Sequence, residues 1–143
     1  MLRVKEIYST ECRSSVEIPL ATGKIAAGFP SPADDFAERS LDLNTYLIKH
    51  PSATFFVRVE GDSMINAGIH SGDILIVDKA LEPQDKKIVV AVVQGDFTVK
   101  RICKINGDFY LMPENQLFKP IKVTEEMAVE IWGVVTYVIH KPQ

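Results

Sequence analysis

The expected fold is decided by residues 88–112, which read IVVAVVQGDFTVKRICKINGDFYLM. Runs of β-branched and aromatic residues alternate here with two short polar stretches, Gln94-Gly95-Asp96 and Asn106-Gly107-Asp108. An Asn-Gly pair between two such runs indicates a two-residue hairpin, because both turn positions must adopt a positive φ angle. The stretch therefore predicts three strands, over residues 88–93, 97–102 and 109–112, joined by tight turns.

The same strand pattern continues on both sides of this stretch. Further runs rich in β-branched and aromatic residues cover 55–60, 74–78 and 129–139. Ahead of them, Leu43 and Leu47 at i, i+4 and the following Pro51 predict a short helix over residues 41–49. We therefore expect a mostly β domain over residues 41–143.

Residues 1–40 differ in character from the rest of the chain. Proline, glycine and alanine punctuate this stretch, and no helical or strand period persists in it for long. Proline fixes its own φ angle and biases the preceding residue towards extended geometry. We expect a flexible N-terminal arm over residues 1–40, placed ahead of the β domain.

Composition excludes several classes of function. The net charge is −3 and only Lys86-Lys87 and Lys100-Arg101 are adjacent basic pairs, so we expect no direct, tight binding of DNA. Cys12 and Cys103 do not make a disulfide framework or a metal-ligand pattern, which is typical of unpaired thiols in a reducing compartment. The first residues lack the apolar core of a signal peptide, and the longest apolar run, 88–93, is too short to cross a bilayer. We expect a cytoplasmic protein with no membrane association.

Two polar residues stand in positions where they can do chemistry together. Ser63 follows the strand at 55–60 and the turn Gly61-Asp62, where a nucleophile gains exposure and nearby backbone N–H groups can face a developing oxyanion. Taken alone, such a serine is more often a turn residue that hydrogen-bonds its own backbone. Lys100 lies in an apolar strand, where desolvation favours a neutral amine, although a surface lysine with a buried stem is the ordinary alternative.

Lysine is a better candidate base than its neighbour Arg101, since guanidinium stays protonated in proteins. A neutral Lys100 that accepts the Ser63 proton would replace the histidine of a Ser-His-Asp triad. The three histidines, His50, His70 and His140, show no supporting acid at a telling position in the sequence. No His/Cys/Asp group has metal-ligand spacing, so we expect no metal and no cofactor.

The arm contains a candidate substrate for such a pair. Residues 24–30 read Lys-Ile-Ala-Ala-Gly-Phe-Pro, in which the Ala27-Gly28 bond is unshielded by large side chains. Glycine permits close approach of a catalytic backbone, and Pro30 keeps the following chain extended. Without the Ser63 and Lys100 pair, this segment would be interpreted as a small-residue linker.

The chain resembles the UmuD branch of the LexA/UmuD (S24) family of self-cleaving Ser-Lys peptidases. The matching motifs, in chain order, are Ala27-Gly28-Phe29-Pro30-Ser31-Pro32, Leu43-Asn44, His50-Pro51-Ser52-Ala53-Thr54, Gly61-Asp62-Ser63-Met64, Gly72-Asp73, Leu75-Ile76-Val77-Asp78, Phe97-Thr98-Val99-Lys100 and Gly133-Val134-Val135. The resemblance implies a LexA/UmuD-type catalytic β domain, with Ser63 as nucleophile, Lys100 as general base and the Ala27-Gly28 bond as the site cut in the protein's own arm. The backbone N–H groups of Ser63 and Met64 would hold the oxyanion.

The resemblance also implies partners. Only 27 residues precede Gly28, too few for the winged-helix DNA-binding domain of LexA-like repressors, so we expect the UmuD branch. In that branch a RecA nucleoprotein filament triggers the cut, and the processed homodimer joins a UmuC-like Y-family translesion DNA polymerase subunit in the SOS response to DNA damage. Two alternatives remain: a non-catalytic dimeric module that binds polymerase and recombinase filament, and a relative of signal peptidases that cuts other proteins.

Overall fold

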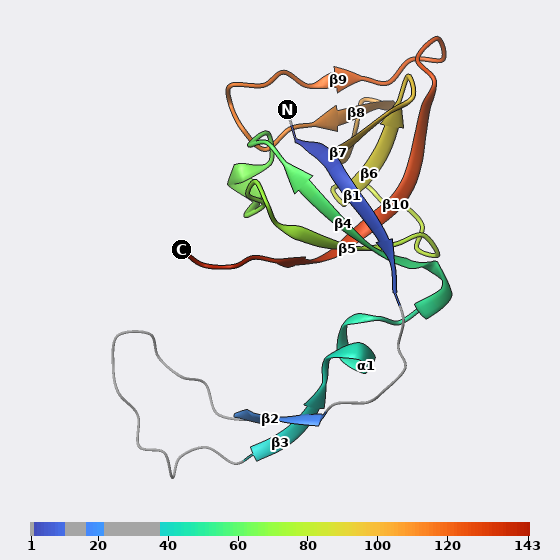
Figure 1. The fold of residues 1–143 in the computed structure, drawn as a ribbon. Helices are drawn as coiled ribbons and strands as arrows, with labels where there is room; N and C mark the ends of the chain where they lie inside the picture. Colours follow the sequence, from blue (N-terminus) through green and yellow to red (C-terminus); the bar gives the residue numbers. More distant parts are fainter. Residues whose placement is uncertain (1, 11–16, 22–37) are drawn as a thin grey trace. The chain divides into compact units, whose positions relative to one another are not determined.

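The computed structural model describes residues 2–10, 17–21 and 38–143 (Figure 1). It divides into two compact units, one of residues Met1–Thr10 and His50–Gln143 and the other of residues Glu11–Lys49. This grouping differs from the division expected at residue 40, because the first ten residues belong with the larger unit. The predicted segment around Ala27 and Gly28 lies outside the described residues.

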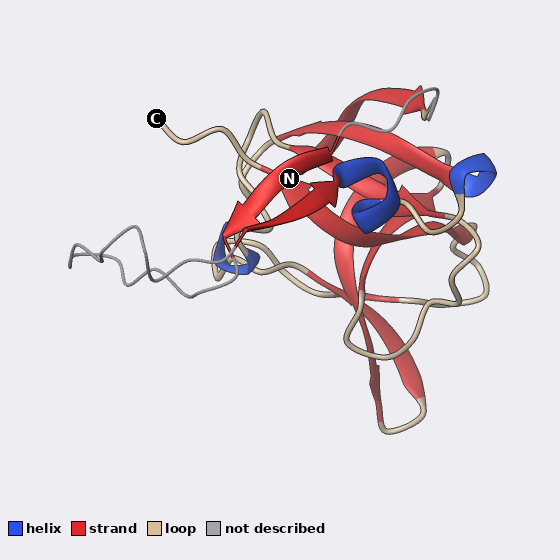
Figure 2. Cartoon of the chain, turned by 90° about the horizontal axis from the view of Figure 1, so that it is seen from below, coloured by secondary structure: helices blue, strands red, loops and turns tan. Residues whose placement is uncertain are grey.

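The larger unit is a β-barrel with a short extension. Its strands are β1 (Arg3–Ser9), β4 (Thr54–Glu60), β5 (Ile74–Asp78), β6 (Ile88–Val93), β7 (Asp96–Ile105), β8 (Asp108–Met112), β9 (Ile121–Lys122) and β10 (Val129–Ile139). Their order in the sheet is β1-β4-β5-β10-β6-β7-β8-β9, and an additional pairing of Arg3 with Thr98 joins β1 to β7. This pairing closes the barrel, and Figure 2 shows its strands in red. The expectation of a mostly β fold is confirmed.

The hairpin turns form where their chemistry predicts them. Asn106 and Gly107 have φ angles of 51° and 83°, and Gln94 and Gly95 have φ angles of 50° and 87°. Positive φ at both central positions gives the turn a twist that matches the twist of the strands it joins. These turns fix the antiparallel register of β6 with β7 and of β7 with β8.

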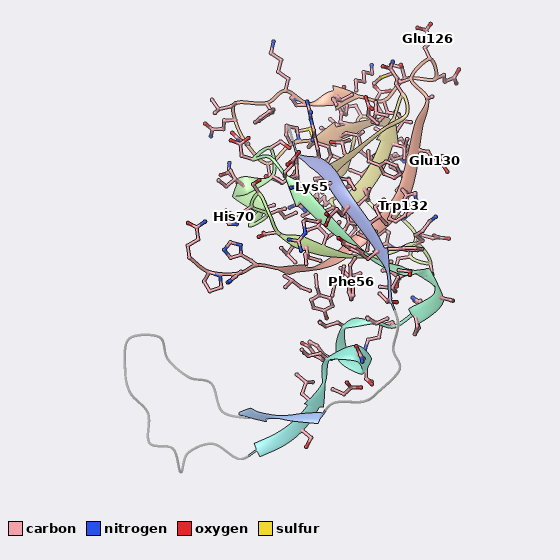
Figure 3. All side chains as sticks on the ribbon, viewed as in Figure 1. Lys5, Phe56, His70, Glu126, Glu130 and Trp132 are labelled. Atoms are coloured by element: carbon pink, nitrogen blue, oxygen red, sulfur yellow. The ribbon has the colours of Figure 1, made fainter. Side chains whose placement is uncertain are left out.

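The barrel interior is filled by aliphatic side chains from β4, β5, β6 and β7, from the loop after β4 and from Leu2. One cluster of fully buried residues comprises Leu2, Val57, Val59, Met64, Ile69, Leu75, Val77, Val90 and Val99. Trp132 on β10 (Figure 3) packs at the side of this cluster, with ring centroids 5.2 Å from Phe55 and 5.8 Å from Phe97. Such dense packing holds the strands, and therefore the side chains they carry, in fixed positions.

Three strands occur in the N-terminal part of the chain, where we expected none. One is β1, in the larger unit. The other two are β2 (Glu17–Ala21) and β3 (Glu38–Asp42), which pair antiparallel in the smaller unit. Strands therefore form in residues 1–40 although no strand period persists in their sequence. β1 forms because its backbone pairs with β4, while its side chains from Arg3 to Ser9 are exposed or half-buried, and so it lacks a hydrophobic period.

The expected helix is present but shorter than predicted. It spans α1 (Leu43–Leu47), and two 3₁₀ helices cover Pro51–Ala53 and Ile65–Ala67. The Asp42 side chain accepts a hydrogen bond from Asn44 N–H and so begins α1, and Ile48 is extended and ends it. In the described part of the chain, no helix has both the length and the apolar character needed to cross a membrane.

Candidate active site

Ser63 lies in the loop that leaves β4. Gly61 turns the chain with a φ angle of 110°, and Gly68 reverses it with a φ angle of 82° after the 3₁₀ helix. The base of the loop is held by the hydrogen bonds Val59 N–H to Asp73 O and Gly72 N–H to Val59 O. These contacts fix where the Ser63 hydroxyl points.

A second anchor lies beyond the loop. Glu114 N–H donates to Ser63 O at 2.8 Å, and Asn66 N–H donates to Glu114 O at the same distance. The segment after β8 therefore braces Ser63 from the other side.

Lys100 projects from β7 towards this loop. Its side chain is 2% exposed, and Nζ lies 3.2 Å from Ser63 Oγ. The structure thus brings together the serine and the lysine that the sequence singled out, which are 37 positions apart. Arg101 instead pairs with Glu114 at the surface, so the lysine, not the arginine, is the cation that lies against the core.

Burial changes the acidity of this lysine. Desolvation lowers the pKa of Lys100 from 10.5 to about 8, because a charge removed from water is destabilised. The neutral amine is therefore accessible close to physiological pH.

Three oxygen atoms surround Nζ, and their positions are compatible with the ammonium and with the neutral amine. Nζ lies 3.0 Å from Val99 O and 2.9 Å from Thr98 Oγ1, besides its contact with Ser63. A carbonyl oxygen can only accept, and the Thr98 hydroxyl donates its own proton to Leu2 O at 3.3 Å. As an ammonium, Lys100 donates its third N–H to Ser63 Oγ; as a neutral amine, it keeps the two other hydrogen bonds and turns its lone pair to the Ser63 proton.

Leu2 completes the site, and sequence reasoning missed it. Its backbone N–H donates to Ser63 Oγ at 2.7 Å, and its side chain is fully buried in the core. Ser63 is consequently 0% exposed, so the expectation that its turn exposes it was wrong. Thr98 was also missed as a site residue, although its place two residues before Lys100 on the same strand could have indicated it.

Comparison with known proteins shows the family of this chain. The chain matches the family described as Peptidase S24-like over residues 19–136, a span that contains Ser63 and Lys100. It belongs to the S24-like peptidase family.

Several relatives of this S24-like chain cover almost its whole length. It is 50% identical to Protein SamA of Salmonella typhimurium over 123 residues, or 86% of this chain and 85% of that protein. It is 42% identical to Protein MucA of Escherichia coli over 134 residues, or 92% and 91% of the two chains. The resemblance stated from the motifs is thereby confirmed.

A repressor also belongs among the relatives of this S24-like peptidase. The LexA repressor of Clostridium perfringens is 37% identical over 117 residues. That match covers 82% of this chain but only 57% of the repressor. The likeness is therefore confined to part of the repressor.

The histidines of the S24-like chain all contact acids, contrary to the expectation from sequence. His50 Nδ1 lies 2.6 Å from Asp78 Oδ2, and His140 Nδ1 lies 2.6 Å from Asp73 Oδ1. His70 (Figure 3) places its ring near the same aspartate, at 3.8 Å. Within the described residues no histidine hydrogen-bonds Ser63, so these pairs form no triad with it.

Asp73 gathers two of these histidines into a cluster that the spacing of 70, 73 and 140 could not reveal. The ligand atoms of His70, Asp73 and His140 lie within 4.8 Å of one another. The carboxylate is already engaged, by His140 at Oδ1 and by His70 N–H at Oδ2. In this structure the cluster ties the turn before β5 to the end of β10.

Proposed function

We propose that this S24-like peptidase cuts its own chain at the Ala27-Gly28 bond, with Ser63 as nucleophile and Lys100 as general base. The observation that carries the proposal is the 3.2 Å approach of a buried lysine, of pKa about 8, to a serine hydroxyl. Activation by an adjacent base is what a hydroxyl nucleophile requires near neutral pH.

The reaction follows the acyl-enzyme scheme. Neutral Lys100 takes the Ser63 proton, and Oγ attacks the Ala27 carbonyl carbon. The backbone N–H groups of Ser63 and Met64 stabilise the oxyanion. The ammonium then gives its proton to the departing Gly28 nitrogen, and water hydrolyses the Ala27 ester to leave a processed chain of residues 28–143.

Intact mass spectrometry tests the proposal directly. Purified protein is incubated at about pH 10, where Lys100 is neutral. We expect one fragment that ends at Ala27 and one that begins at Gly28, and neither fragment from Ser63→Ala or Lys100→Ala. Cutting at another bond, or undiminished cutting in Ser63→Ala, would overturn the assignment.

A substitution at Gly28 tests which bond is cut. Gly28→Trp leaves Ser63 and Lys100 intact but adds bulk beside the bond, so we expect the chain to remain uncut. Reaction of Ser63 with a fluorophosphonate, which modifies activated serines, should continue in this variant. Efficient cutting of Gly28→Trp would place the substrate bond elsewhere.

The cellular role rests on the family resemblance. The processed chain is proposed to act as a homodimer and as the accessory subunit of a UmuC-like Y-family DNA polymerase in error-prone translesion synthesis. A RecA nucleoprotein filament is the proposed trigger, and the cytoplasmic location stays a prediction. If the filament does not accelerate the cut in vitro, the trigger is wrong. If the chain binds filament and polymerase but is never cut, it is the non-catalytic interaction module.

A further inference from the structure

One residue far from Ser63 in the sequence fills the space in front of it. Leu2 N–H donates to the nucleophilic oxygen, Leu2 O accepts from Thr98, and the Leu2 side chain is 0% exposed. A nucleophile must approach a carbonyl carbon to about 3–3.5 Å before it can attack. Leu2 presents an N–H instead, so it binds at the site as a ligand and blocks entry of a substrate bond.

The segment that follows Leu2 is a strand in the sheet. Arg3 pairs with Glu60, Val4 with Val59, and the register continues along β4 to Ser9 and Phe55. On its other side, β1 pairs with β7 only at Arg3 and Thr98. Residues 2–9 therefore occupy a seam between β4 and β7, and the serine and lysine lie at the end of that seam.

This seam has the properties of a groove for an extended peptide. Backbone groups on the edge of β4 give sequence-independent pairing, as in strand addition, and the space that holds Leu2 takes one apolar side chain. A substrate segment needs the same two features, a paired backbone and a residue inserted beside Ser63. Both occupants cannot be present together.

We propose that the seam between β4 and β7 is the peptide-binding groove of the peptidase, and that residues 2–9 of this chain are its internal ligand, which must leave Ser63 before the segment of Ala27 and Gly28 can enter. This inference rests on the proposed function of Ser63 and Lys100. It adds the occupant of the groove and the step that precedes the cut.

The contacts of β1 make its departure feasible. Beyond Leu2, only Val4 among residues 3–9 is shielded from solvent, and then only in part. The seam with β7 is also open at one point, where a cavity of about 450 Å³ is lined by Arg3, Val4, Gly95, Asp96 and Phe97. Leu2 is thus the main buried side-chain anchor of the strand, to which Glu6 adds an exposed ion pair with Arg58 of β4 at 3.3 Å.

Leu2→Asp tests the role of this anchor. A carboxylate resists burial, so the strand should withdraw from Ser63. We expect self-cleavage at about pH 9 to accelerate about tenfold, which corresponds to about 1.4 kcal/mol, and labelling of Ser63 by a fluorophosphonate to accelerate in parallel. Ile7→Asp is the matched control, because it places the same charge on the same strand at an exposed side chain and should leave both rates near those of the parent.

A reversible lock tests the same step without removing Leu2. Arg3→Cys/Glu60→Cys, made with Cys12 and Cys103 changed to serine, places two thiols at a directly paired position of β1 and β4. The oxidised form should neither cut itself nor react with the fluorophosphonate, and reduction should restore both reactions to the rates of the parent chain.

The outcomes separate the two proposals. If the oxidised chain cuts and labels as fast as the reduced chain, or Leu2→Asp matches its parent in both rates, residues 2–9 are no competitor and the inference is wrong while the peptidase stands. If no variant is ever cut or labelled at Ser63, the peptidase assignment itself fails.

Discussion

Lys100 is buried where a cation is disfavoured, and this desolvation favours the neutral amine that a general base requires. Its amine meets two acceptors, Thr98 and Val99, and the Ser63 hydroxyl, and no buried side-chain nitrogen or oxygen among the described residues lacks a partner. Burial, rather than a neighbouring charge, is the cause of its lowered pKa. The base is therefore tuned by its position in the barrel wall.

The pH dependence of cutting follows from this pKa. Because Lys100 titrates at about 8, roughly one chain in ten carries the neutral amine at pH 7 and nearly all do at pH 10. The rate of self-cleavage should rise about tenfold from pH 7 and level off above about pH 9. Rates measured from intact masses across this range check it, and a flat profile would argue against lysine as base.

Stability should depend on pH through the same group. The pKa of Lys100 is about 8 in the folded state and near 10.5 when unfolded, so the unfolded state binds more protons between these values. The free energy of unfolding should therefore rise with pH across this window, by about 1–3 kcal/mol. Urea unfolding of Ser63→Ala and of Ser63→Ala/Lys100→Met from pH 7.5 to 10.5 isolates the effect, since neither chain cuts itself. Equal slopes in the two variants would contradict it.

At the scale of the elements, the packing of β10 against β5 requires a glycine at position 133. Its register with β6 shifts between Ile131 and Gly133, and a Cβ added at Gly133 would lie 2.5 Å from Val77 Cγ1 on β5. No side chain fits there without moving a buried valine.

Gly133→Ala should therefore destabilise the protein by about 1–3 kcal/mol through overpacking. Val77→Ala removes the opposing methyl groups, so the double variant should be more stable than the sum of the single losses predicts. Denaturant unfolding of all four chains measures this coupling. Strict additivity would show that the contact does not carry the cost.

The elements predicted from sequence are those with local signals. The strands at 74–78, 88–93 and 129–139 have the expected bounds, because hairpin turns and apolar runs specify them locally. β1 was missed because its stability comes from pairing with β4, some fifty positions away, and not from its own residues. The same reason hid Leu2, whereas the Ser63 and Lys100 pair was found because each sits on an element with a readable pattern.

At the scale of the whole molecule, the barrel is built from two separated parts of the chain. Residues Met1–Thr10 supply β1, and residues from His50 onward supply the rest. A cut at Ala27 would break the covalent link between β1 and the other strands. The hydrogen bonds between β1 and β4 would be untouched by that reaction.

The shorter product should therefore stay bound after the cut. We expect the fragment that ends at Ala27 to co-elute with residues 28–143 in size-exclusion chromatography of concentrated protein, and to separate on dilution or in urea. Leu2→Asp should lose the fragment at concentrations where the parent retains it. Complete separation at every concentration would show that β1 pairs only while it is tethered.

Retention of β1 after the cut would limit the number of turnovers of each molecule. A product that returns to the groove inhibits the enzyme that made it. Each molecule would therefore complete a single turnover and then become inactive. Attack on a second chain would have to wait until the fragment dissociates. A peptidase built in this way limits its own proteolysis to one bond, without any separate inhibitor.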